Sequence, residues 1–79
     1  MNATPLNHFP SGSKVKIVDF HAGGAARGRL LALGLTPGTE ILLTSTGQGP
    51  CKMKVRDSEL VLGQGLASKV LAYLSESTG

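Results

Sequence analysis

The sequence is poor in the residues on which many functional classes depend. It has one cysteine, Cys51, and no tryptophan, and its aromatic residues are Phe9, Phe20 and Tyr73. A single cysteine excludes an internal disulfide framework and fits a reducing compartment. No apolar run approaches the roughly 18 residues that span a bilayer, and the N-terminus lacks the charged and apolar regions of a signal peptide. We therefore expect a soluble, cytoplasmic protein.

Length and charge narrow the functional classes further. The 79 residues correspond to a single domain, residues 1–79, with a lead-in over residues 1–11 and a frayed tail over residues 75–79. A chain this short buries only roughly 60–65% of the surface that its unfolded form exposes, so a deep catalytic cleft is hard to build. The net charge of +3 favours an acidic partner surface but falls well short of a nucleic-acid-binding tail.

A short helix is expected to start near Gly24, with a glycine in place of a side-chain cap at its N-terminus. Ala26, Leu30 and Leu33 are spaced i, i+4 and i+7, so they should form its buried face. Gly28 lies inside the helix, at a cost of roughly 0.5–1 kcal/mol relative to alanine.

Two turn signals follow this helix directly. Gly34 predicts a Schellman stop, because glycine enters the left-handed conformation without a Cβ penalty. Leu35 then falls at the C″ position, where its side chain folds back onto the last helical turn. Residues 36–39, Thr-Pro-Gly-Thr, predict a type II turn with proline at its second position and glycine at its third.

The remaining chain is dominated by short alternating segments typical of half-buried strands. Strands are expected over residues 14–18, 39–46, 51–56, 59–62 and 69–74, with a single helical turn over 63–68. Ile41 and Leu43 should point inward and Leu42 outward. The sequence therefore predicts a mainly β fold, a small partly closed barrel of about five strands with one α-helix inserted after the first strand.

The order of these elements and the residues at their turns and inward faces resemble the FeoA family from about Gly12 to Leu74. The most specific portion is the run Arg-Leu-x-x-Leu-Gly-Leu-x-Pro-Gly that begins at Arg29. The further matching residues are Ile41, Gly49, Pro50, Met53, Val55, Leu60, Leu62, Ala67 and Val70. Gly63 departs from the pattern, since the family often has a basic residue there. The resemblance implies an SH3-like barrel.

The same resemblance implies a function. FeoA proteins are small cytoplasmic partners of the ferrous iron transporter FeoB, so we expect an accessory protein that docks on the GTP-binding cytosolic domain of FeoB and modulates its assembly or activity. Such a protein would meet the membrane only through FeoB, at its inner face, and would be a monomer with at most weak self-association. The same domain occurs at the C-terminus of metal-dependent repressors, so the alternative is a peptide-binding or regulatory module. A small basic barrel for RNA is a third candidate, and it predicts a steep loss of affinity with salt.

Catalytic and metal sites are not indicated. The candidate ligands are His8, His21, Cys51, Asp19, Asp57 and Glu59. None of them forms a close spacing such as Cys-x-x-Cys or His-x-x-x-His. Cys51 lies on an apolar face, where cysteine usually behaves as a small hydrophobic residue, and no third group completes a Cys–His pair. We expect no enzyme activity, no catalytic residue, no resident metal and no cofactor.

Two sets of residues are candidates for partner docking. Arg27 and Leu31 share the outer face of the helix, and with the corner at Gly34, Leu35 and Thr36 they should form a partner-facing patch. A second set is basic: Lys14 and Lys16 on the first strand, and Lys52, Lys54 and Arg56 on the third. If these strands lie close together, the barrel shows a positive stripe, which serves either as a solvated face that discourages aggregation or as a docking surface.

Overall fold

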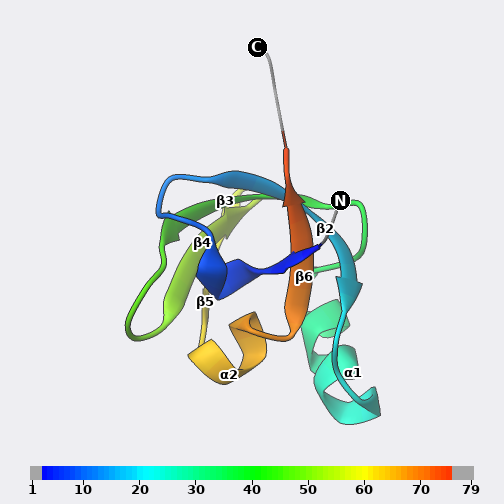
Figure 1. Cartoon of the computed structure of the whole chain (residues 1–79). Helices are drawn as coiled ribbons and strands as arrows, with labels where there is room; N and C mark the ends of the chain where they lie inside the picture. The colour runs from blue at the N-terminus through cyan, green and yellow to red at the C-terminus, as the bar shows by residue number, and fades with distance from the viewer. Residues whose placement is uncertain (1–2, 76–79) are drawn as a thin grey trace.

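A computed structural model describes residues 3–75 of the chain, and six strands form one antiparallel sheet around its core (Figure 1). The elements in chain order are β1 (Thr4–Pro5), the 3₁₀ turn η1 (Leu6–His8), β2 (Lys14–Phe20), α1 (Gly24–Ala32), β3 (Glu40–Ser45), β4 (Cys51–Val55), β5 (Ser58–Leu62), α2 (Gln64–Ala67) and β6 (Val70–Leu74). The strand order across the sheet is β1-β6-β2-β3-β4-β5. The mainly β, SH3-like barrel with one inserted helix is therefore confirmed.

Alternation along the strands builds the core. In β4, Cys51, Met53 and Val55 are buried, while Lys52 and Lys54 between them are exposed. The buried apolar side chains come from every strand after β1, from η1, and from both helices. Because each strand offers only its inward face, the sheet must curl around a single layer of side chains.

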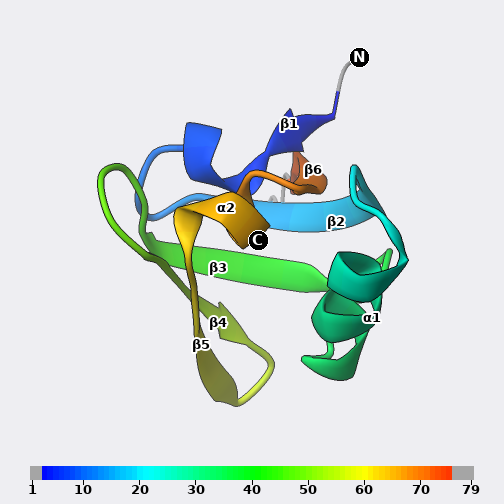
Figure 2. The same ribbon diagram turned by 90° about the horizontal axis from the view of Figure 1, so that it is seen from below.

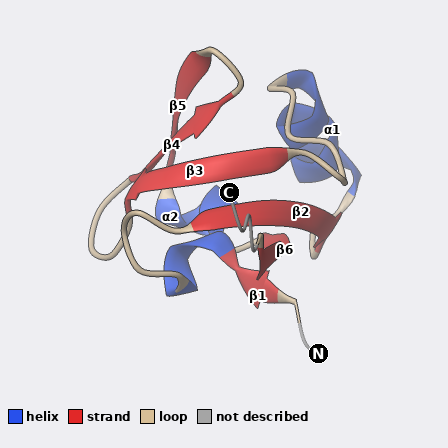
Figure 3. Ribbon diagram, turned by 90° about the horizontal axis from the view of Figure 1, so that it is seen from above, coloured by secondary structure: helices blue, strands red, loops and turns tan. Residues whose placement is uncertain are grey.

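The two helices lie at different ends of this curled sheet. α2 contacts η1 and β5, and Figure 2 shows α1 at the other end, beside the start of β3. Figure 3 shows α1 and the tip of the β4–β5 hairpin standing on the same side of β3. The two segments on which the sequence places candidate docking residues are thus brought to one side of the barrel.

The lead-in is more ordered than its composition indicates. Thr4 and Pro5 pair with Ala72 and Leu71 of β6, which adds a two-residue strand to the five expected. Leu6 is fully buried and Phe9 is 9% exposed, so both contribute to the core.

β2 runs to Phe20, beyond the expected end at residue 18. A shift of register between Ile17 and Asp19 inserts a bulge, after which pairing with β6 continues to Phe20 and Val70. The alternation is lost at such a bulge, so the pattern could not show that the strand continues. A frayed tail is expected from residue 75, but the Ser75 N–H donates to the carbonyl of Lys14 at 2.8 Å; the rest of that prediction lies outside the described residues.

The helix stop has the predicted Schellman geometry. Gly34 has φ +89°, its N–H bonds to the carbonyl of Leu31 at 3.0 Å, and the Leu35 N–H bonds to that of Leu30 at 3.1 Å. The type II turn is confirmed as well, with Gly38 at φ +93° and the Thr39 N–H bonded to the Thr36 carbonyl at 3.1 Å.

The prediction that Leu33 lies on the core face is wrong, since this side chain is 43% exposed. Leu33 is the C-cap residue of α1, and the chain turns back immediately after it. Leu35 is fully buried and Leu30 is the one buried residue of the helix. The apolar side chain that covers the last turn is therefore Leu35, and Leu33 is left at the surface.

Candidate partner-docking surfaces

The C-terminal corner of α1 exposes two leucines, of which Leu33 lines a small groove. Leu31 is 40% exposed and Leu33 is 43% exposed. The groove has a volume of about 170 Å³ and separates the corner from the β4–β5 hairpin. Its lining residues are Leu33, Gly34, Val55, Arg56, Ser58 and Leu60. We call this surface, together with Leu31, the helix corner.

The residues that the sequence predicts at this corner differ in their exposure. Leu31, Gly34 and Thr36 lie at or near the surface, whereas Leu35 is fully buried and offers no side chain to a partner. The hydroxyl groups of Thr36 and Thr39 lie 2.9 Å apart and hydrogen-bond to each other. Leu35 therefore anchors the corner from inside, and Thr36 stiffens the turn that follows.

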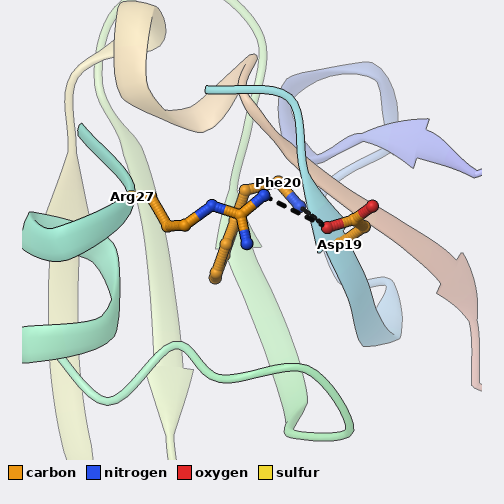
Figure 4. A network of polar contacts seen from close by, with 3 residues as sticks. All are labelled: Asp19, Phe20 and Arg27. Carbon is orange, nitrogen blue, oxygen red and sulfur yellow. Dashed lines mark hydrogen bonds and ion pairs between the residues drawn. The ribbon is translucent and has the colours of Figure 1, made fainter. Parts of the chain in front are cut away.

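Arg27 is engaged within the chain (Figure 4). Its guanidinium lies 3.7 Å from Asp19 Oδ1 and 5.7 Å from the centre of the Phe20 ring. Asp19 Oδ1 also accepts the Phe20 backbone N–H at 2.7 Å. These contacts join α1 to the end of β2, so Arg27 positions the helix whose corner exposes Leu31.

The basic residues lie on β2, on β4 and in the turn after β4, and β3 runs between the two strands that carry the lysines. Lys14 of β2 lies opposite Leu42 of β3, and Leu42 lies opposite Lys54 of β4. Two residues after Lys14 on β2, Lys16 pairs with Glu40, and two residues before Lys54 on β4, Lys52 pairs with Val61 of β5. Leu42, 37% exposed as the alternation predicts, therefore stands between two lysines.

Arg56 connects the two surfaces. It occupies the β4–β5 turn with φ +58° and lines the groove of the helix corner. It also lines a wider, shallow hollow of about 630 Å³. The residues around that hollow are Lys16, Thr36, Pro37, Gly38, Thr39, Glu40 and Arg56.

Eight lining residues of these surfaces escaped the sequence-based prediction: Leu33, Val55, Ser58 and Leu60 at the groove, and Pro37, Gly38, Thr39 and Glu40 at the hollow. The helical period assigned Leu33 to the core, and nothing in a local pattern brings Leu60 of β5 to the end of α1. A signal was available for Glu40, because an outward residue directly after the turn at 36–39 must lie at the rim of that turn.

The candidate metal and catalytic residues do not come together. Within residues 3–75, no group of three or more His, Cys, Asp and Glu side chains is placed to hold a metal ion. Cys51 is 2% exposed, and its burial raises the pKa of the thiol above the ordinary value of 9.0. The sulfur therefore keeps its proton and packs as an apolar side chain. No helix of this part of the chain combines the length and the hydropathy needed to cross a membrane.

Comparison with known proteins gives one consistent family. The FeoA domain family model matches residues 4–73. The chain is 28% identical over 75 residues to a Methanocaldococcus jannaschii protein named "Putative Fe(2+) transport protein A", covering 95% of this chain and 92% of that one.

Solved structures share the fold. A crystal structure of an iron uptake regulatory protein (FeoA) superposes with a TM-score of 0.82 at 32% identity, covering 89% of this chain and 95% of that one. A manganese-dependent transcriptional repressor gives a TM-score of 0.83 at 12% identity, covering 92% of this chain and 42% of the repressor. At this identity the repressor shares the fold alone.

Proposed function

Because the chain belongs to the FeoA family, we propose that it is a non-catalytic accessory protein of ferrous iron transport that docks on the cytosolic GTP-binding part of the FeoB transporter. The fold supplies a rigid surface, and the proposed activity is binding. Cytoplasmic residence at the inner face of the membrane follows from this proposal, because the partner surface lies there.

The helix corner carries the proposal. Leu31 and Leu33 are exposed two residues apart at the end of α1, and Leu33 lines a groove together with Val55 and Leu60. Isolated surface leucines are common, but an exposed leucine at a concave edge beside other apolar side chains is typical of protein interfaces. A partner side chain that enters the groove would contact Leu33 and Leu60, while Leu31 would meet the partner outside the groove.

The corner is also held rigidly. The two Schellman hydrogen bonds, the buried Leu35 and the hydrogen-bonded turn at residues 36–39 fix the backbone on which the leucines stand. A surface that is already ordered loses little conformational entropy on binding, so more of the contact free energy appears as affinity.

Docking can regulate the transporter only through a difference in affinity. If the corner binds the GTP-bound and GDP-bound conformations of FeoB unequally, it shifts their equilibrium by the ratio of the two dissociation constants. Equal binding to both would make the protein an assembly factor and leave the equilibrium unchanged.

The test is a calorimetric titration of this protein against the cytosolic part of FeoB from the same cell. It is run with GDP and with a non-hydrolysable GTP analogue, each with and without ferrous iron. We expect binding, with an affinity that depends on the nucleotide. An absence of binding under all four conditions contradicts docking on this part of FeoB.

Substitution at the helix corner tests the surface itself. Leu31→Asp should weaken the affinity for the cytosolic part of FeoB about tenfold or more, because an apolar contact of the proposed interface is replaced by a desolvated charge. Leu74→Asp is the matched control, since Leu74 is 62% exposed and lies on β6, away from the corner. Equal affinity of the Leu31→Asp variant and the control, with both folded by circular dichroism, would contradict the assignment.

A second candidate function rests on the fold shared with the repressor, namely a regulatory module that binds a proline-rich segment. Grooves that bind such segments are lined by aromatic side chains, whereas the groove at the helix corner has none. The composition of the groove therefore favours a protein surface over a proline-rich peptide.

A further inference from the structure

The outer face of β2, β3 and β4 gathers most of the positive charge of the chain. Five of its eight Lys and Arg residues project from these strands and the turn after β4: Lys14, Lys16, Lys52, Lys54 and Arg56. The strand order alone brings them together, because β3 lies between β2 and β4. We call these residues and Leu42 the cationic face.

We propose that the cationic face binds an acidic protein segment that carries an apolar side chain between carboxylates. This surface shares Arg56 with the helix corner but otherwise consists of different residues, and the proposal does not depend on FeoB as the partner.

The central row, formed by Lys14, Leu42 and Lys54 across the three strands, determines which chemistry a partner must have. Leu42 is flanked by Lys14 on one side and Lys54 on the other, at directly opposite positions of the sheet. Opposite residues in neighbouring strands have Cβ atoms about 4.5–5.5 Å apart. An extended segment with a leucine or valine over Leu42 thus directs the carboxylates two residues to either side of it toward the two ammonium groups, because side chains i and i±2 share a face.

The charges on this face are available to a partner. Within residues 3–75, the ion pair that forms joins Arg27 to Asp19, and none holds a cation of the cationic face. Glu40, opposite Lys16, accepts a hydrogen bond from the hydroxyl of Ser75. Exposed cations without an ion-pair partner in this part of the chain gain the most from an incoming carboxylate.

The end of the face near the turn at residues 36–39 offers a further anchor. Lys16 and Arg56 both line the hollow of about 630 Å³, together with the Thr39 side of the turn. A guanidinium and an ammonium across a shallow hollow suit a carboxylate group that both can contact.

An acidic protein fits this face better than a membrane or a nucleic acid. The face carries two carboxylates of its own, Glu40 and Glu59, the latter opposite Lys54. A continuous layer of phosphates would repel both carboxylates, whereas a protein segment can place neutral or basic side chains over them. The central row also presents a leucine where base stacking would require an aromatic ring.

The test is an NMR titration of the labelled protein with two synthetic peptides. One carries a leucine between pairs of glutamates, and the other has alanine in place of that leucine. We expect shifts confined to amides of β2, β3 and β4, tighter binding of the leucine peptide, and loss of affinity between about 20 mM and about 300 mM salt. Shifts confined to the helix corner, or no shifts at low salt, would overturn the proposal.

Variants separate a specific face from general charge attraction. The double variant Lys14→Gln, Lys54→Gln should bind the leucine peptide about tenfold or more weakly, because two cations that contact the peptide are lost. The single control Lys69→Gln removes a cation from the α2–β6 connection, outside the cationic face. Each of the single variants Lys14→Gln and Lys54→Gln should weaken binding more than the control does. Equal effects of the three single variants would overturn the assignment.

Leu42→Ala tests the apolar component. It should remove the preference for the leucine peptide over the alanine peptide while leaving the salt dependence intact. Binding to phosphatidylserine vesicles without binding to either peptide would overturn the protein proposal in favour of a lipid surface. Since the FeoB titration uses a different probe, and Lys14, Leu42 and Lys54 lie outside the helix corner, either proposal can fail without the other.

Discussion

At the scale of single residues, two glycines at α1 show how position decides the effect of a side chain. Gly28 lies inside the helix, and Gly34 follows it with φ +89°. A Cβ added at either position would meet no atom within 4 Å, so steric crowding does not distinguish them. The backbone conformation does, because a left-handed residue with a Cβ is strained and a helical glycine carries excess unfolded-state entropy.

We therefore predict opposite effects of the same substitution. Gly28→Ala should raise the free energy of unfolding by about 0.5–1 kcal/mol, and Gly34→Ala should lower it by about 1–2 kcal/mol. Thermal unfolding followed by circular dichroism resolves both, since 1 kcal/mol shifts Tm by about 4–8 °C in a domain of this size. A stabilising Gly34→Ala would mean that the Schellman stop does not persist in solution.

At the scale of elements, α1 depends on a few tertiary contacts. Its nine residues are fewer than the roughly 12–15 that an isolated helix needs to be stable in water, and Leu30 is its one buried side chain. The ion pair of Arg27 with Asp19 and the contact with the Phe20 ring add the remaining link to β2. The orientation of the helix corner is thus set by these contacts.

A double-mutant cycle measures this link. Arg27→Met keeps much of the apolar stem and removes the charge, and Asp19→Asn keeps an oxygen that accepts the Phe20 N–H. We predict a coupling free energy of about 0.2–1 kcal/mol that decreases with salt, because both groups are largely exposed. A coupling of zero at low salt in urea unfolding would show that Leu30 and the Phe20 contact alone hold the helix.

At the scale of the whole molecule, the short lead-in completes the barrel. β1 pairs with β6, and Leu6 directly after it is fully buried among residues from the sheet. The free energy of unfolding of a domain of this size is small, so one core side chain from a short terminal segment contributes a large fraction of it.

Leu6→Ala should therefore destabilise the fold by about 2–5 kcal/mol. Val61→Ala is the control, because Val61 is 60% exposed on β5 and its truncation should change the free energy by less than about 0.5 kcal/mol. Urea unfolding of the two variants compares them directly. Similar midpoints for both variants would contradict the role of the lead-in as part of the core.

The sequence predicts those parts of the candidate surfaces that depend on the period of a single helix or strand, and it misses those that depend on contacts between elements. Leu31 and Leu42 are exposed as their helix and strand periods predict. Leu33 is exposed although its period places it inside, because a helix of nine residues ends before the next turn can bury it. Arg27 was expected to face a partner, and its contacts with Asp19 and Phe20 depend on the bulge in β2, which no alternation reveals.

By itself the sequence determined the Schellman stop, the type II turn and the inward and outward faces of the strands, because these depend on the φ preferences of single residues and on side-chain period. Only the tertiary structure decided which residues become neighbours across the sheet. Placing β3 between β2 and β4 puts Leu42 between Lys14 and Lys54, and curling the sheet brings the β4–β5 hairpin to the end of α1. Both surfaces arise from strand order, which is set by burial of the whole core and which no short segment of the chain encodes.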